Sequence, residues 1–244
     1  MSKILSYFFA ATLLVVCFVS PVAAKKRILV FSKTAGFHHS AIPVGIATIQ
    51  KMGLTNKFEV DTTVDAKNFT PKNLKKYAAV VFLNTTGDVL NDEQQTAFEQ
   101  YIKNGGGYVG VHAATDTEYQ WAWYGKLAGA YFINHPQQQM ATLNVVNRNT
   151  IATKHLPETW SRKDEWYNFK DISKDIKVLI AIDESSYKGG KNQPVHPMAW
   201  YHDFDGGRSF YTGLGHVEES YTDPLFLQHL LGGIQYAMGV KKME

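Results

Sequence analysis

Short, almost wholly apolar runs alternate with helix-forming segments in the first half of the chain, and this alternation most constrains the fold. Three runs have the length and composition of buried strands: residues 27–31, 78–83 and 107–111. Residues 41–52 carry apolar side chains at helical spacing up to Gly53, and residues 91–103 begin with the capping-box pair Asn91 and Gln94. The alternation predicts an α/β fold in which a parallel sheet is joined by right-handed crossovers.

The second half of the chain is less regular. Strands are predicted there at residues 141–146 and 176–182. In the first half, a further strand is predicted at residues 58–61, and a short helix is predicted to begin at Thr70–Pro71. Residues 198–202 and 208–212 flank Asp205–Gly206, which predicts a β-hairpin with a tight turn. Residues 225–238 are apolar enough for a closing helix packed on the sheet.

The first 24 residues have the composition of a secretory signal peptide. Lys3 precedes an apolar run over residues 4–19, and small residues lead to a predicted cleavage after Ala24. A membrane anchor is the alternative, but the run is short for a spanning helix. The sequence therefore predicts a single domain over residues 25–244, located in the periplasm or outside the cell, with no membrane partner after cleavage.

The composition of the predicted mature chain excludes several classes of function. Without Lys3, the 25 basic residues fall to 24 against 22 acidic ones, and they form no basic stripe, so nucleic acid is not an expected partner. Cys17 is the only cysteine and lies in the predicted signal peptide. A thiol nucleophile, a disulfide and cysteine-bound zinc are therefore excluded from the mature protein.

Polar and titratable residues follow the predicted strands, where the carboxyl ends of a parallel sheet bind ligands. A glycine-rich turn at residues 105–107 leads into a run that stops at His112, in the place where related architectures carry a serine or cysteine nucleophile. Loops 33–40, 84–88 and 112–118 should meet at this edge. They hold Thr34, His39, Ser40, Thr85, Asp88, His112, Thr115 and Asp116.

The chain resembles the trehalose-utilisation, or ThuA-like, family in several ordered motifs. They are Phe31 with residues 34–42, residues 86–90, 106–117, 129–136, 164–167 and 197–200, Gly207–Arg208, and residues 213–216. The resemblance extends from about Lys26 to Gly239 and implies a flavodoxin-like fold similar to class I glutamine amidotransferases. It also implies a role in the metabolism of trehalose and other glycosides.

The candidate site combines the loop residues with four residues from these motifs. We predict catalytic roles for His112, Glu165, Asp116 and His39, because histidine exchanges protons near neutral pH and a carboxylate can orient it. Substrate contacts are predicted for Thr34, Ser40, Thr85, Asp88, Thr115, Tyr167, His135 and His216. In the alternative, His112 only bonds a loop carbonyl, and His39 is exposed beside a helix capped by Ser40.

The cofactor and the reaction stay open at this level. His39, His112, His135, His216 and Glu165 offer donors that suit a divalent metal, but no pair has the spacing of a helical metal motif, so a metal-free site is favoured. The sequence favours an enzyme that acts on a sugar, glycoside or keto-sugar as a hydrolase, lyase or isomerase. A carbohydrate-binding module without turnover and a metal-dependent hydrolase or lyase are the alternatives.

Overall fold

The computed structural model describes residues 25–244, so the predicted signal peptide lies outside the described residues. A nine-stranded sheet forms the centre, with strand order β2-β1-β3-β4-β11-β10-β9-β6-β7. Its strands are β1 (Arg27–Phe31), β2 (Glu59–Thr63), β3 (Ala79–Leu83), β4 (Gly107–Val111), β6 (Gln139–Val145), β7 (Thr159–Asp164), β9 (Lys177–Ile182), β10 (His196–Phe204) and β11 (Gly207–Thr212). A separate ribbon pairs β5 (Tyr131–Asn134) with β8 (Asn168–Lys170).

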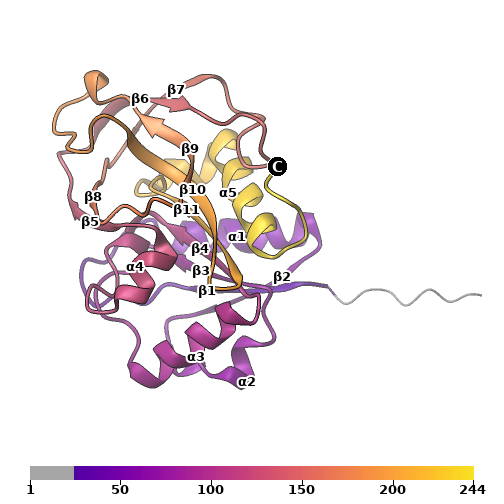
Figure 1. Cartoon of the computed structure of the whole chain (residues 1–244). Helices are drawn as coiled ribbons and strands as arrows, with labels where there is room; N and C mark the ends of the chain where they lie inside the picture. Colours follow the sequence, from indigo (N-terminus) through magenta and orange to yellow (C-terminus); the bar gives the residue numbers. More distant parts are fainter. Residues whose placement is uncertain (1–24) are drawn as a thin grey trace, which may run out of the picture.

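Helices cover both faces of this sheet (Figure 1). They are α1 (Ile42–Asn56), α2 (Pro71–Leu74), α3 (Asp92–Lys103), α4 (Ala122–Ala128) and α5 (Pro224–Ala237). Figure 1 shows α1 and α5 on one face, with α2, α3 and α4 on the other. Pairing is parallel from β2 to β11, so the predicted α/β fold with flanking helices is confirmed. Among the described residues, no helix is both long and apolar enough to cross a membrane.

The predicted hairpin is part of the central sheet. β10 and β11 pair antiparallel, and the turn between them places Asp205 at φ 49° and Gly206 at φ 89°, as a two-residue hairpin turn requires. β11 also pairs with β4 in parallel. The hairpin therefore joins the parallel half of the sheet to an antiparallel half made of β10, β9, β6 and β7.

One helix end differs from the prediction. Gly53 does not stop α1, which continues to Asn56 and ends where Lys57 adopts φ 62°. A Cβ at Gly53 would lie 2.6 Å from a methyl carbon of Val60. The glycine thus serves the close approach of α1 to β2, and a left-handed residue beyond it ends the helix.

The short elements α4, β5, β7 and β8 were not predicted. β7 alternates buried and exposed residues with charged side chains, and its buried positions include Arg162 and Asp164. Hydrophobic periodicity therefore gives no signal for this strand, because two of its inward-facing side chains are charged.

A buried histidine in α5 gives the fold a pH-dependent stability. His229 is fully buried, and its Nδ1 donates to the carbonyl of Ala152 at 2.8 Å. Burial lowers the pKa of His229 to about 4, so the ring stays neutral in the folded protein, whereas in the unfolded chain it takes up a proton near pH 6.5. His229 should therefore contribute a fall of about 3 kcal/mol to the free energy of unfolding between pH 6.5 and 4, and none above pH 6.5.

Urea unfolding across this pH range measures the effect. His229→Asn keeps an amide donor for the Ala152 carbonyl but cannot titrate, so its stability should fall less steeply between pH 6.5 and 4 than that of the wild type. Equal slopes for the two proteins would contradict the assignment.

Candidate active site

The site begins at His112, the first residue after β4. His112 is fully buried and opens a short 3-10 turn (His112–Thr115) with φ 48°, a left-handed conformation that non-glycine residues rarely adopt. Such backbone strain persists where the surroundings over-determine it, often at functional sites. The strand-to-helix corner thus presents an imidazole at the sheet edge.

The hydrogen bonds of His112 define which ring nitrogen faces the site. Its Nδ1 lies 2.9 Å from the carbonyl oxygen of Gly213, and because a carbonyl only accepts, Nδ1 carries the hydrogen. The predicted alternative, a bond to a loop carbonyl, is therefore correct for one nitrogen. The other nitrogen, Nε2, faces the side chains of His216 and Glu165.

Two more histidines come from loops at the same sheet edge. His39 lies between β1 and α1, and His216 lies four residues after β11 ends, so both follow strands that run parallel to β4. His39 is only 3% exposed, and the N-cap of α1 is Ala41 without a side-chain cap. The alternative of an exposed His39 beside a Ser40 cap is therefore wrong.

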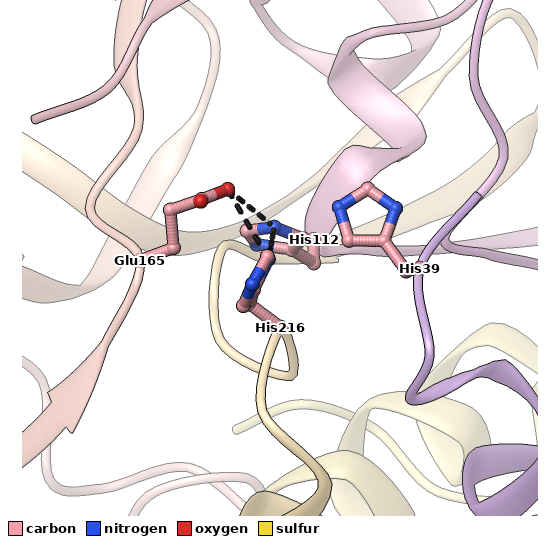
Figure 2. A group of neighbouring side chains, drawn as sticks. All are labelled: His39, His112, Glu165 and His216. Atoms are coloured by element: carbon pink, nitrogen blue, oxygen red, sulfur yellow. Dashed lines mark hydrogen bonds and ion pairs between the residues drawn. The ribbon is translucent and has the colours of Figure 1, made fainter. Parts of the chain in front are cut away.

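Glu165 completes the group from the residue after β7. Its Oε2 lies 3.3 Å from Nε2 of His112 and 3.2 Å from Nδ1 of His216, and these two nitrogens are 3.1 Å apart (Figure 2). Figure 2 shows the His39 ring facing these three side chains from the opposite side. One ligating atom from each of the four residues lies within 4.8 Å of the others. We call His39, His112, Glu165 and His216 the histidine–glutamate centre.

The environment lowers the pKa values of Glu165 and His39, but for different reasons. Burial would raise the pKa of Glu165, but hydrogen bonds to His112 and His216 outweigh it and hold the pKa well below the usual range. Burial, followed by the charges of His112 and His216, lowers the pKa of His39 to about 3. The centre therefore contains an ionised carboxylate and a His39 ring that is neutral near pH 7.

Asp164 holds the loop that carries His216, and sequence reasoning gave it no role. This fully buried carboxylate accepts the backbone N–H of Gly215 at 3.2 Å and of His216 at 3.3 Å. It also pairs with Arg162 at 3.4 Å. Its position within the motif Asp164–Tyr167 was the available signal, but only the folded chain shows its partners.

The rim of the centre is aromatic and acidic. The Tyr167 ring lies 4.2 Å from the His112 ring, centroid to centroid, and Nδ1 of His135 lies 3.3 Å from Oε1 of Glu165. Asp116 accepts a hydrogen bond from Tyr119 at 2.6 Å, and burial raises its pKa. Phe37, which was not predicted, is 66% exposed with its ring 4.9 Å from that of His39.

The remaining predicted residues make no hydrogen bond to the four side chains of the centre within the described chain, although Thr115 donates to the backbone carbonyl of His112 at 3.5 Å. Thr85 and Thr115 are fully buried and bond to Thr117 and Tyr211, so their hydroxyls hold the loops together. Thr34 bonds to His38, whereas Ser40 and Asp88 are exposed. His135, proposed from the sequence as one of five metal donors, lies outside the group of four.

The comparisons with known proteins agree on one family and one fold. The family model ThuA, described as trehalose utilisation, matches residues 27–237. A ThuA-like protein of Bacteroides uniformis has a TM-score of 0.75 at 24% identity, covering 93% of this chain and 97% of its own. A ThuA-like protein of Parabacteroides merdae has a TM-score of 0.75 at 21% identity, covering 89% and 91%.

More distant structures extend the similarity to amidotransferases. The glutaminase domain of the Trypanosoma brucei CTPS has a TM-score of 0.52 at 10% identity, covering 90% of this chain and 96% of that domain. The predicted amidotransferase-like fold is therefore confirmed. No curated protein sequence matches the chain.

Proposed function

Because this chain belongs to the ThuA, trehalose-utilisation family, we propose that its histidine–glutamate centre is the reactive centre of an enzyme that acts on a sugar or glycoside. One observation carries the proposal. Three imidazoles and a carboxylate, far apart in sequence, converge at the carboxyl edge of the sheet with ligating atoms within 4.8 Å. Titratable groups that converge in this way are the usual signature of catalysis.

Two carboxyl groups at the site are held in different protonation environments. Hydrogen bonds to histidine lower the pKa of Glu165, whereas burial raises the pKa of Asp116. Environments that push the pKa values of two carboxyl groups apart give the two groups different roles in proton transfer. Glu165 then stays ionised and orients His112, which accepts a proton from the substrate, and Asp116 returns one.

The rim suits a sugar. Phe37 is exposed beside His39 and offers its face, whereas Tyr167 is buried between His112 and Phe132 and supports the centre from within. Aromatic faces pack on the C–H faces of sugar rings, while the polar edges of His135 and Asp116 can bond to hydroxyl groups. We therefore propose a small sugar or glycoside as the partner of this site.

The N-terminal sequence supports a location for this activity. The composition of residues 1–24 is that of a cleaved signal peptide, so we propose that the protein works in the periplasm or outside the cell. Sugars available in those compartments are then its substrates.

A substrate screen tests the function. Purified protein is incubated with trehalose, other glycosides and their keto derivatives, and products are separated by chromatography. We expect turnover of at least one sugar. In Asp116→Asn, kcat should fall by about 100-fold or more, because the amide cannot exchange a proton. Asp175→Asn, which changes an exposed carboxylate just before β9, should match the wild type.

The same screen separates an enzyme from a binding module. If calorimetry detects binding of a sugar that the protein does not convert under any condition tested, the result would contradict the proposed enzyme and favour a binding protein.

A further inference from the structure

We propose that His39, His112, Glu165 and His216 together bind one divalent transition-metal ion. The inference deepens the proposed function, on which its catalytic meaning rests, but metal binding itself can be measured without a substrate. Three independent features of the centre carry it: the spacing of the acceptor atoms, the unsatisfied His39 ring, and the hydrogen bonds that orient the other rings.

The spacing brings three possible ligand atoms together. Nδ1 of His112 donates to Gly213, so an ion would displace the proton from Nε2, which lies 3.3 Å from Oε2 of Glu165 and 3.1 Å from Nδ1 of His216. Ligands bound at about 2.1 Å to one ion in tetrahedral geometry are about 3.4 Å apart. The three atoms therefore have nearly the separations that a shared ion would impose.

His39 provides the fourth donor. Its side chain is almost completely buried, yet its ring makes no hydrogen bond to any described residue. The ring nitrogen of His39 that faces the other three side chains in Figure 2 has no hydrogen-bond partner among the described residues, and an ion at the centre would give it one. The four ligating atoms span up to 4.8 Å, and ligands of one tetrahedral ion are about 3.4 Å apart, so closure requires the most distant pair to approach by about 1.4 Å.

The surrounding hydrogen bonds have the form found around metal-bound histidines. A histidine ligand usually donates its second N–H to a carbonyl or carboxylate, as His112 does to Gly213. The side-chain amide nitrogen of Gln138 lies 2.7 Å from Nε2 of His216, and a half-turn of this amide would place its oxygen there to accept Nε2–H when Nδ1 binds an ion. Asp164 holds the backbone of the same loop. Nδ1 of His135 lies at the other oxygen of Glu165, which leaves Oε2 for the ion.

The donor set indicates the class of metal. Imidazole suits zinc, iron, nickel and copper, and one carboxylate leaves a divalent ion with net positive charge. Such an ion would polarise a sugar carbonyl or hydroxyl oxygen, or ionise a bound water.

Calorimetry on chelator-stripped protein tests the proposal, with Zn²⁺ as the titrant and Co²⁺ absorption as a second measurement of coordination. We expect one ion per chain, and affinity about 100-fold weaker or more in His216→Ala and Glu165→Gln. His38→Ala is the matched control, because this exposed neighbour of His39 bonds only to Thr34 among the described residues. It should bind Zn²⁺ as tightly as the wild type.

The outcomes separate this inference from the proposed function. Absence of stoichiometric binding by the wild-type protein overturns the metal site, even if sugars are consumed, and so does equal affinity in all variants. The wild-type titration decides the question if a variant fails to fold. One bound ion lost in both variants supports the metal site, even if no sugar in the screen is consumed, in which case the proposed enzyme alone fails.

Discussion

His112→Ala should abolish turnover, with kcat/KM falling by about 1,000-fold or more. The ring nitrogen Nε2 lies within 3.3 Å of both Glu165 and His216, so its removal takes away the group on which the centre converges. General acid–base catalysis alone contributes about 100- to 10,000-fold, and loss of the ring also removes any ion held there. Initial rates on the sugar identified in the screen measure the loss.

A second substitution separates chemistry from backbone strain. Residue 112 adopts φ 48°, which asparagine tolerates better than alanine. His112→Asn should therefore be the more stable of the two variants in thermal unfolding, and yet equally inactive. His38→Ala should keep wild-type rates. An active His112→Asn enzyme would show that the imidazole takes no part in the reaction.

Asp164→Ala should lower the free energy of unfolding by about 3–5 kcal/mol. The carboxylate is fully buried and pairs with Arg162, which is itself only 9% exposed, so its removal leaves a buried positive charge with less compensation. It also removes the acceptor for the backbone N–H groups of Gly215 and His216. Urea unfolding measures the stability. A parallel rate measurement should show that activity is also lost, because the loop that carries His216 is no longer held in place.

A double variant identifies the cause of this loss. Arg162→Leu with Asp164→Ala removes both charges, and it should be less destabilised than Asp164→Ala alone if the uncompensated guanidinium is the main cost. Lys103→Ala removes an exposed ion pair with Glu99 and should change stability by about 0.5 kcal/mol or less. A similarly small effect of Asp164→Ala would show that the buried pair does not anchor the loop.

The histidines after β1 and β4 were predictable because both strands have a strong local pattern: His112 directly follows β4, and His39 lies in the loop between β1 and α1. Buried strands are continuous apolar runs, and in a parallel sheet their carboxyl ends must share an edge, so His39 and His112 had to lie near each other. The capping box at Asn91 and the turn at Asp205–Gly206 are equally local, and the structure confirms both.

Glu165 and His216 could be selected only by resemblance to a family. Glu165 follows β7, an edge strand whose inward-facing residues include Arg162 and Asp164, so its pairing is invisible to hydrophobic periodicity. Phe37 and Asp164 were missed for a related reason. The buried carboxylate of Asp164 acquires its role from Gly215 and His216, which are distant in the chain, and Phe37 acquires its role only because His39 beside it joins the centre.

The sequence by itself determined the alternation of strands and helices, and therefore which loops lie at the carboxyl edge of the sheet, because these properties depend on side-chain periodicity and on turn chemistry within a few residues. Only the tertiary structure decided that Glu165 joins His112 and His216, and which ring nitrogen each histidine presents. The physical reason is that these contacts join segments about 50 to 100 residues apart, where strand register and hydrogen-bond partners exist only in the folded chain.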